Sequence, residues 1–573
     1  MNKEHHRDSE VHRSFSTSLS LCASLVLVSS VAQRRDSLSP LGIQCAYTAV
    51  NPKVEAALDL LAVRNPASGA VLAELPRSSE AEIHAAVKAA RAAQPAWNGL
   101  GAAERARILR RFQKILHARK SEVARLITEE AGKPSVEALL TEVLVVLDAA
   151  GFCAENAGAV LRPERMPHAN PVMKAKAGRL LREPHGVVGI ISPWNYPFSI
   201  PATETMAALA MGNTVVLKPS EFTPLTSLLL RTLLLEAGVP EDVLHVVVGE
   251  GPVGAALLAS PIDKLVFTGS VATGKRVAQA AAERLLPVVL ELGGKDPMLV
   301  LEDADVDIAS SAAVWGAFVN AGQTCLSVER CYVHRSLYSR FTELCAEKAA
   351  RLRVGNGLEP EVEVGPMIHE RQVRTVEQHV DEAIALGARL LTGGKRLPNL
   401  GPNFYAPTVL ADVNHGMRIM REETFGPVLP IMPFDSERDA IALANDSEFG
   451  LSASVWTNDR ARGEAIASRL EAGTVMVNDA VTCFGISEAP HGGIKASGIG
   501  RTHGRLGLEE MVRTKYIASD LLPSVRKVWW YGYGADFRRQ MEGFLDFLFS
   551  NSLARRLRGG LKSTAAMVRK NRV

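Results

Sequence analysis

Three side chains of this sequence could together perform covalent chemistry on a carbonyl group. Cys325, in the run NAGQTCLSVER, could act as a nucleophile if a dipole or a nearby base stabilised its thiolate. Glu291 follows the apolar run VVL and precedes a pair of glycines, where a carboxylate could serve as a general base. Asn195, in SPWN, carries an amide that could bind an oxyanion. Taken alone, the cysteine would more often be a small buried hydrophobe, and the glutamate an ordinary loop residue.

Two further motifs predict a dinucleotide site. The run KLVFTGSVATGK places Gly269 and Gly274 between a strand and a helix, like the outer glycines of GxGxxG. Val271 occupies the position of the middle glycine, so a pyrophosphate would be held less closely there. Lys218 and Glu221, in KPSE, follow another apolar run and could bind the hydroxyl groups of a ribose. An isolated pair of this kind can also be only a surface ion pair.

The elements that must position these residues alternate along the chain. Short apolar runs are separated by helical stretches at 200–212, 224–238, 251–260 and 272–284. This alternation predicts right-handed βαβ units and a parallel sheet that is buried on both faces, and a second α/β stretch follows from about 305 to 500. The runs are VVGIIS (187–192), NTVVLKPS (213–220), VLHVVVG (243–249), KLVFTGS (264–270), LPVVLELGG (286–294) and PMLVLED (297–303).

Upstream of these units, Arg64 to Gly69 reads as a turn between two short strands. Ser79 and Glu82 then form a capping-box pattern that predicts the start of a helix. A second predicted helix carries Ile108, Leu109, Phe112, Ile115 and Leu116 on one face.

Composition limits the class of protein. The chain has 573 residues, of which 47% are hydrophobic, so it can bury more than one core. Its net charge of only +3 argues against a nucleic-acid-binding protein. The seven cysteines form no CxxC pair, so we expect no disulfide framework, no metal site and a reducing, cytoplasmic location. No apolar run reaches the roughly 18 residues of a membrane-spanning helix.

Both ends of the chain differ from this core. Residues 1–62 are expected to form a poorly ordered leader. Within it, Leu19 to Ala32 ends in SVA like a signal cleavage site, but the mixed charges that precede it are atypical, so a targeting signal stays open. Residues 519–573 hold WWYGYG, apolar residues at near-helical spacing, and then Arg555, Arg556 and Arg558. This tail predicts an amphipathic helix on its own domain, on a partner subunit or on a membrane surface.

Seven motifs in order resemble those of the NAD(P)-dependent aldehyde dehydrogenase superfamily, over residues 64 to 518, and the tail is loosely similar to that of the plant family-22 aldehyde dehydrogenases. The resemblance implies an α/β fold with a Rossmann-like cofactor domain (63–290) that is interrupted by bridging strands at about 160–184. It also implies a catalytic α/β domain (291–507) and a bridging strand (508–518) that pairs subunits into a homodimer or homotetramer. The motifs are ISPWNYPF, KPSE, FTGSxxxG, ELGGK, GQTC, EETFGPV (422–428) and PHGGIKASGIGR (490–501).

The resemblance also implies a role for each matching residue. Cys325 would attack an aldehyde, Asn195 would hold the oxyanion, and Glu291 would activate the water that hydrolyses the thioester. Hydride would pass to NAD(P)+, with NAD favoured because Glu221 would repel a 2′-phosphate. Glu423 would hold the nicotinamide ribose, and no metal is implied. The cofactor-binding residues would be Ser192, Trp194, Lys218, Ser220, Glu221, Gly269, Ser270, Gly274, Leu292, Glu423 and Phe425.

Other functions stay open at this point. A coenzyme-A-acylating branch typically lacks a carboxylate at the position of Glu291, and a non-catalytic, membrane-tethered interaction protein would not need Cys325. A papain-like hydrolase would require a histidine base that no other feature supports.

The residues around the predicted nucleophile bear on the substrate. His491 stands where many relatives have phenylalanine, and is interpreted as a tolerated wall residue. We expect Tyr196 and residues 481–487, including Phe484, to line the pocket. No arginine flanks Cys325, which disfavours a dicarboxylate semialdehyde and favours a medium or long aliphatic or aromatic aldehyde.

Overall fold

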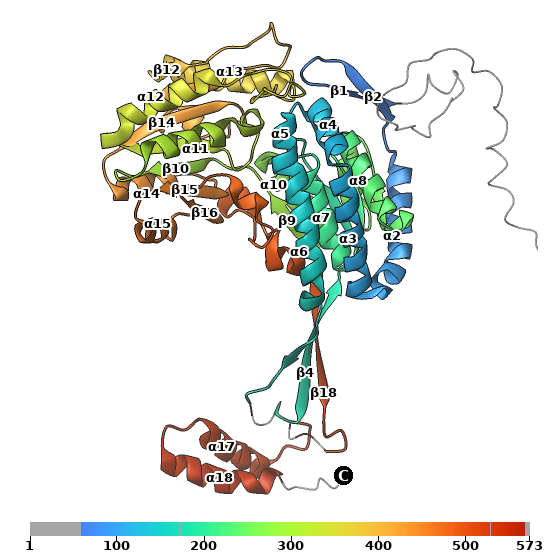
Figure 1. Cartoon of the computed structure of the whole chain (residues 1–573). Helices are drawn as coiled ribbons and strands as arrows, with labels where there is room; N and C mark the ends of the chain where they lie inside the picture. The colour runs from blue at the N-terminus through green and yellow to red at the C-terminus, as the bar shows by residue number, and fades with distance from the viewer. Residues whose placement is uncertain (1–58, 171–172, 526, 528, 568–573) are drawn as a thin grey trace, which may run out of the picture. The chain divides into compact units, whose positions relative to one another are not determined.

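A computed structural model describes residues 59–170, 173–525, 527 and 529–567 (Figure 1). The predicted leader and its targeting segment therefore lie almost entirely outside the described residues. The first strand, β1 (Leu60–Arg64), begins slightly before the boundary expected at residue 62. It pairs with the antiparallel strand β2 (Val71–Pro76), and the predicted turn is closed by Asn65, whose Oδ1 accepts hydrogen bonds from the backbone of Ala67 and Ser68.

The predicted parallel sheet is present, with six strands in the order β17-β9-β8-β5-β6-β7. Its strands are separated in sequence by α7 (Ser199–Ala210), α8 (Pro224–Glu236), α9 (Gly251–Ala259) and α10 (Val271–Ala282), which confirms the βαβ units. The strands are β5 (Val187–Ile191), β6 (Thr214–Lys218), β7 (Leu244–Val246), β8 (Lys264–Thr268), β9 (Val288–Glu291) and the antiparallel β17 (Gly498–Ile499).

Both faces of this first sheet are covered, because the central positions of its longer strands are apolar and buried. Val215 and Leu217 pack into a core with α3, α6, α7 and α8, whereas Val216 packs into a second core with α2, α9 and α10. Neighbouring residues of a strand point to opposite faces, so an uninterrupted apolar run matches a sheet between two helical layers. The helices upstream are α2 (Glu80–Gly99), α3 (Gly101–Ala118), α4 (Lys120–Ala131), α5 (Ser135–Ala138) and α6 (Leu144–Val160), with a π-helical turn at Leu139–Val143.

The helices that precede the sheet also match the sequence. The predicted capping box starts α2, because Ser79 Oγ accepts from the Glu82 backbone and Glu82 Oε2 accepts from the Ser79 backbone at 2.7 Å. The predicted apolar face of α3 is buried, apart from a half-buried Ile115.

One apolar run does not join the first sheet, although the alternation of runs and helices grouped it there. PMLVLED forms β10 (Asp296–Val300), which belongs to a second sheet of seven strands in the order β12-β13-β14-β11-β10-β15-β16. The chain crosses between the sheets at Gly293 and Gly294, a step that the alternation of runs does not reveal. The other strands are β11 (Val328–His334), β12 (Arg389–Thr392), β13 (Thr408–Ala411), β14 (Val428–Phe434), β15 (Ser452–Trp456) and β16 (Thr474–Val477). The helices are α11 (Val306–Phe318), α12 (Arg335–Arg351), α13 (Glu370–Ala385), α14 (Glu437–Asn445) and α15 (Arg460–Ala467).

A third, three-stranded sheet contains the expected bridging segments. It has the order β18-β4-β3, from β3 (Glu164–Met166), β4 (Lys176–Pro184) and β18 (Val512–Asp520). The strand expected at 508–518 is shifted, because residues up to Glu510 form α16 (Gly504–Glu510) and the strand continues to Asp520.

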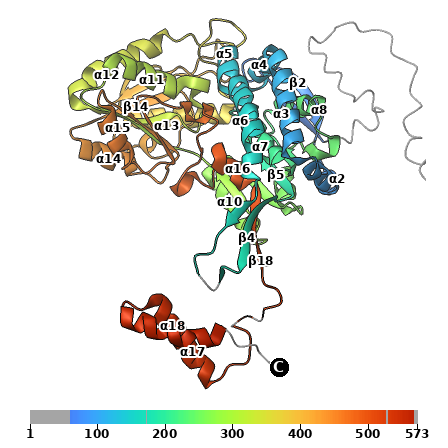
Figure 2. The same ribbon diagram turned by 60° about the horizontal axis from the view of Figure 1, so that its bottom comes forward.

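The tail forms two helices rather than one. α17 (Ala535–Phe549) and α18 (Leu553–Met567) pack side by side as a hairpin (Figure 2). They approach closely at two glycines, since a Cβ on Gly559 would lie 2.3 Å from the carbonyl oxygen of Gly543. Within the described residues, no helix has the length and apolar character needed to cross a membrane.

Candidate active site

A cavity of about 780 Å³ collects most of the residues singled out in the sequence. Its walls come from the loops that follow β5, β6, β8 and β9 in the first sheet, and from the segments that precede β11 and β14 in the second sheet. The carboxyl ends of parallel strands are the usual ligand-binding edge of such sheets. The cavity thus lies where the sequence motifs predicted a site.

Cys325 follows an unusually constrained loop. Asn320 and Ala321 have φ angles of 55° and 56°, in the left-handed region that non-glycine residues rarely adopt. Gln323 secures this loop, since its Nε2 donates to the Asn320 carbonyl at 3.0 Å and its Oε1 accepts from the Ile368 backbone at 2.9 Å. Gln323 and Asn320 therefore act as supports for the cysteine, a role that the sequence prediction missed.

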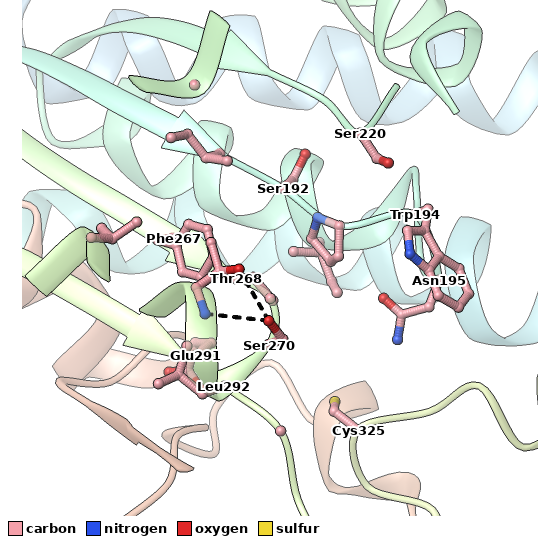
Figure 3. Close-up of a pocket in the computed structure, with 18 of the residues that line it drawn as sticks. Ser192, Trp194, Asn195, Ser220, Phe267, Thr268, Ser270, Glu291, Leu292 and Cys325 are labelled. Atoms are coloured by element: carbon pink, nitrogen blue, oxygen red, sulfur yellow. Dashed lines mark hydrogen bonds between the residues drawn. The ribbon is translucent and has the colours of Figure 1, made fainter. Parts of the chain in front are cut away.

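Asn195 is fastened to the same loop. Its Nδ2 donates to the Gln323 carbonyl at 3.1 Å, and Asn320 Nδ2 donates back to the Asn195 carbonyl at 2.9 Å. Figure 3 shows the Asn195 amide and the Cys325 sulfur pointing toward each other. A primary amide carries two N–H donors, so one remains for an oxygen atom bound beside the sulfur.

Burial dominates the charge state of both reactive groups. It raises the pKa of the Cys325 thiol well above its ordinary value, and the carboxylates of Asp296 and Glu423 raise it further. Burial also raises the pKa of Glu291 well above its ordinary value, helped by the neighbouring Glu204. Burial therefore disfavours the ionised form of both groups, and both become more reactive as the pH rises.

The predicted ribose pair lies in the cavity and is not an exposed ion pair. Lys218 ends β6, is buried, and places its Nζ 3.5 Å from Oε2 of Glu221. Ser192, at the end of β5, has a buried Oγ without a hydrogen-bond partner in the described residues, although it lines the cavity. An unpaired buried hydroxyl beside a charged pair suits a polar ligand.

The glycine-containing turn after β8 has two separate functions. Gly269 and Ser270 line the cavity, and Ser270 caps α10 by accepting a hydrogen bond from the Thr273 backbone at 3.4 Å (Figure 3). Gly274, which was expected to border a pyrophosphate, does not line the cavity. A Cβ on Gly274 would lie 2.4 Å from Cδ2 of Leu292, so this glycine lets α10 pack against the segment that follows β9.

Glu423 and Phe425 also line the cavity, on a loop whose support no motif of the sequence indicates. The backbone of Gly294 donates to Glu423 Oε1 at 3.1 Å, and the Phe425 ring stands edge-on to Trp194 at 5.4 Å. Glu329 holds the loop by accepting from the backbone of Thr424 and Phe425 at 2.8 Å each. Its charge is matched by buried Lys295, whose Nζ lies 2.5 Å away.

Another part of the lining consists of Phe484, His491 and His503, which we call the aromatic end of the cavity. Both histidine rings stand edge-on to Phe484, at 5.2 Å and 4.5 Å. Within residues 481–487, Phe484 alone lines the cavity. The lysine and arginine side chains of the lining, Lys218, Arg276 and Arg371, come from other segments.

Tyr196 was predicted to line the pocket, but it is not among the lining residues. It is buried behind the cysteine loop, where its hydroxyl lies 2.9 Å from Thr324 Oγ1 and Lys133 Nζ lies 3.6 Å from its ring centre. Lys133 is in turn paired with Glu142 at 2.5 Å. Tyr196 therefore supports the loop rather than contacting a ligand.

Comparisons with known proteins give a consistent result. The aldehyde dehydrogenase family matches residues 54–517. The 4,4'-diapolycopene aldehyde oxidase of Methylomonas sp is 40% identical over 496 residues, which cover 85% of this chain and 91% of that protein. The mitochondrial succinate-semialdehyde dehydrogenase of Arabidopsis thaliana is 41% identical over 457 residues, which cover 79% and 85%. A crystal structure of Mycobacterium tuberculosis aldehyde dehydrogenase complexed with NAD+ aligns with a TM-score of 0.77 and 38% identity, over 83% of this chain and 96% of that chain.

Proposed function

The chain belongs to the aldehyde dehydrogenase family and oxidises an aldehyde to the carboxylic acid with NAD(P)+, and on this basis we propose which of its residues perform each step. Cys325 is the nucleophile, Asn195 is the oxyanion donor and Glu291 is the general base. The observation that carries this assignment is the hydrogen bond from Asn195 Nδ2 to the Gln323 carbonyl, which fixes the amide beside the sulfur. A donor held in place before the reaction stabilises developing charge without reorganisation.

These residues divide the oxidation into two stages. The Cys325 thiol releases its proton to solvent, and the thiolate attacks the aldehyde carbon. The resulting oxyanion accepts a hydrogen bond from the free N–H of Asn195. A nicotinamide dinucleotide held in the cavity would supply the hydride acceptor for the oxidation. Glu291 then takes a proton from the water that attacks the thioester, and the carboxylic acid leaves as the Cys325 thiolate is restored.

The residues present suit a dinucleotide. Lys218 and Glu221 offer a donor and an acceptor for ribose hydroxyls, and the unpaired Ser192 hydroxyl faces the same cavity. We assign Ser192, Trp194, Ser220, Gly269, Ser270, Leu292, Glu423 and Phe425 to the same binding surface, because all of them line the cavity. We propose a preference for NAD over NADP, since the Glu221 carboxylate would lie close to a 2′-phosphate and repel it.

For the substrate we propose an apolar aldehyde of medium or long chain, or an aromatic one. The aromatic end of the cavity offers Phe484 and two histidines that burial keeps neutral, with the pKa lowered to about 3 for His491 and about 4 for His503. A substrate carboxylate placed there would lose its hydration without gaining a cationic partner.

A panel of aldehydes tests this function. NADH formation by the purified full chain is measured with decanal, benzaldehyde and succinate semialdehyde, with NADP+ run alongside NAD+. We expect kcat/KM to be at least about tenfold higher for decanal than for succinate semialdehyde, because burying an unpaired carboxylate is costly. We also expect NAD+ to be favoured at least about tenfold. Succinate semialdehyde as the best substrate would contradict the substrate proposal, and no oxidation of any aldehyde would contradict the assigned roles.

We propose that the first sheet and its helices form the cofactor domain, the second sheet the catalytic domain, and the third sheet a subunit-pairing element. β18 is an edge strand of the third sheet, so one side of its backbone is free to pair with another chain. This supports a homodimer or homotetramer, and the molar mass of the full chain by light scattering decides between monomer and oligomer.

We propose that the tail docks on the surface of an anionic lipid bilayer. On α18, Leu553, Leu557 and Leu561 are spaced by one helical turn and are 73%, 63% and 79% exposed. The same helix carries Arg555, Arg556, Arg558 and Lys562 and no acidic residue. An exposed leucine stripe beside basic residues is typical of helices that lie in a membrane interface.

The chain that precedes α17 also exposes large aromatic side chains, namely Trp529, Trp530, Tyr531 and Tyr533. Tryptophan and tyrosine favour the headgroup layer of a bilayer. The described cysteines are free, which supports a cytoplasmic location, where the bilayer presents anionic lipids.

Vesicle co-sedimentation tests the docking surface. We expect the full chain to sediment with vesicles that contain about one-third phosphatidylserine, and to be released at high salt. The double change Arg555→Ala/Arg558→Ala should weaken binding about 30-fold, since each basic residue near the surface contributes about 1 kcal/mol. Arg438→Ala/Arg460→Ala, on α14 and α15, is the matched control and should bind like the unchanged chain. Equal binding by both double variants, or none by the unchanged chain, would contradict the proposal.

A further inference from the structure

The base that must activate water has no hydrogen-bond partner for its carboxyl group within the described residues. Glu291 is buried at the end of β9, and neither oxygen of its carboxyl group makes a hydrogen bond within the described residues. One basic side chain of the described chain comes within ion-pair distance, namely His491, whose Nε2 lies 3.7 Å from Glu291 Oε2. This separation is slightly longer than a hydrogen bond, so a small side-chain rotation would close it.

The His491 ring is held in a fixed orientation. Its backbone N–H and carbonyl both pair with Thr502, at 2.8 Å each. The ring is only 5% exposed and stands edge-on to Phe484 at 5.2 Å and to His503 at 5.9 Å. Its Nδ1 has no partner in the described chain, whereas its Nε2 faces Glu291, so a proton on Nε2 gains an acceptor that a proton on Nδ1 lacks.

Several other charged or titratable groups surround the Glu291 carboxyl. Glu204 on α7 and Glu510 on α16 disfavour its ionisation, whereas Arg501 favours it. Arg501 is already committed, because its Nη1 donates to the carbonyls of Gly493 and Gly500. Cys325 lies across the cavity and His503 lies behind His491, whose own pKa is lowered to about 3 mainly by burial. His491 is therefore neutral, and a neutral imidazole still offers one N–H donor.

We propose that His491 is a positioning residue for Glu291: its Nε2–H donates to the ionised carboxylate and holds it in place for thioester hydrolysis. This inference rests on the proposed role of Glu291 as the base. The water oxygen attacks the thioester carbon, Glu291 accepts the proton of that water, the carbon–sulfur bond breaks, and Cys325 leaves as the thiolate. His491 stabilises the ionised carboxylate until it takes up this proton, and His491 itself exchanges no proton.

Two substitutions at this position separate the hydrogen bond from the ring shape. His491→Phe preserves the planar ring against Phe484 but removes the donor, whereas His491→Gln supplies a neutral N–H donor of similar reach. The acyl-enzyme is formed in a single turnover with NAD+ and decanal, and its decay is followed by intact mass between pH 6 and pH 10. Hydride transfer is followed in the same experiment through the NADH burst.

We expect His491→Phe to leave the NADH burst unchanged, to slow acyl-enzyme decay about tenfold at pH 7, and to move the acidic limb of the decay rate up by about one pH unit. His491→Gln should restore decay to within about threefold of the unchanged chain. His84→Asn, which removes an exposed imidazole on α2 that does not line the cavity, should leave the limb in place. An unmoved limb in His491→Phe, no rescue by glutamine, or an equal loss in the burst would overturn the proposal. If Glu291→Gln itself hydrolyses the thioester at the normal rate, the assignment of the base fails instead, whatever His491 does.

Discussion

Replacing Cys325 with alanine removes aldehyde oxidation, with an expected loss in kcat of about 10⁴-fold or more. No other described thiol can take over, because Cys153, Cys331, Cys345 and Cys483 are all buried and none of them lines the cavity. Without the sulfur there is no covalent adduct from which hydride can leave, so the remaining groups can only bind an aldehyde. NADH formation with decanal measures the loss.

The matched control is Cys345→Ala, which removes a thiol from α12 without changing the cavity and should retain most of the activity. Binding of NAD+ to Cys325→Ala, measured by calorimetry, should stay within about threefold of the unchanged chain, since alanine removes only one side-chain atom from the cavity wall. Activity above about one per cent in Cys325→Ala would contradict the nucleophile assignment.

Glu291→Gln should separate the two stages of the reaction. We expect one equivalent of NADH per active site in a rapid burst, followed by turnover that is slower by about 10²- to 10³-fold. The amide is similar in shape to the carboxyl group but cannot take a proton from water, so the acyl group stays on Cys325. Intact-mass measurement after the burst should show the added mass of the acyl chain.

The pH dependence of the same stage follows from the buried position of Glu291. Its pKa is raised, and the ionised form is the active base, so hydrolysis in the unchanged chain should speed up as the pH rises through that value. In Glu291→Gln this limb should vanish. A burst that disappears together with turnover would place Glu291 in the first stage instead and contradict the assignment.

The parts of the site that follow from short motifs could be predicted from the sequence. Lys218 and Glu221 follow β6, and Gly269 and Ser270 follow β8, so their placement at one edge of a parallel sheet follows from the alternation of apolar runs. Cys325 and Asn195 share the cavity for a different reason, because the carboxyl ends of β5 and the segment before β11 meet there.

The remaining features depend on contacts between distant segments. Tyr196 was expected in the pocket, but Lys133 and Thr324 hold it behind the cysteine loop, and no local pattern encodes that pairing. Glu329 supports the loop of Glu423 across the second sheet, and its sequence neighbours give no sign of it. His491 looked like a neutral wall residue until the fold placed it beside Glu291.

The segment in which the chain crosses between the two sheets connects the two reactive residues. Glu291 ends β9 of the first sheet, and Asp296 begins β10 of the second, so only a few residues separate the two layers here. This segment packs directly against the nucleophile, because a Cβ on Gly294 would lie 2.4 Å from the Cys325 carbonyl oxygen. The same short segment therefore carries the base at one end and contacts the nucleophile near its middle. A change in its length would move the two reactive groups relative to each other.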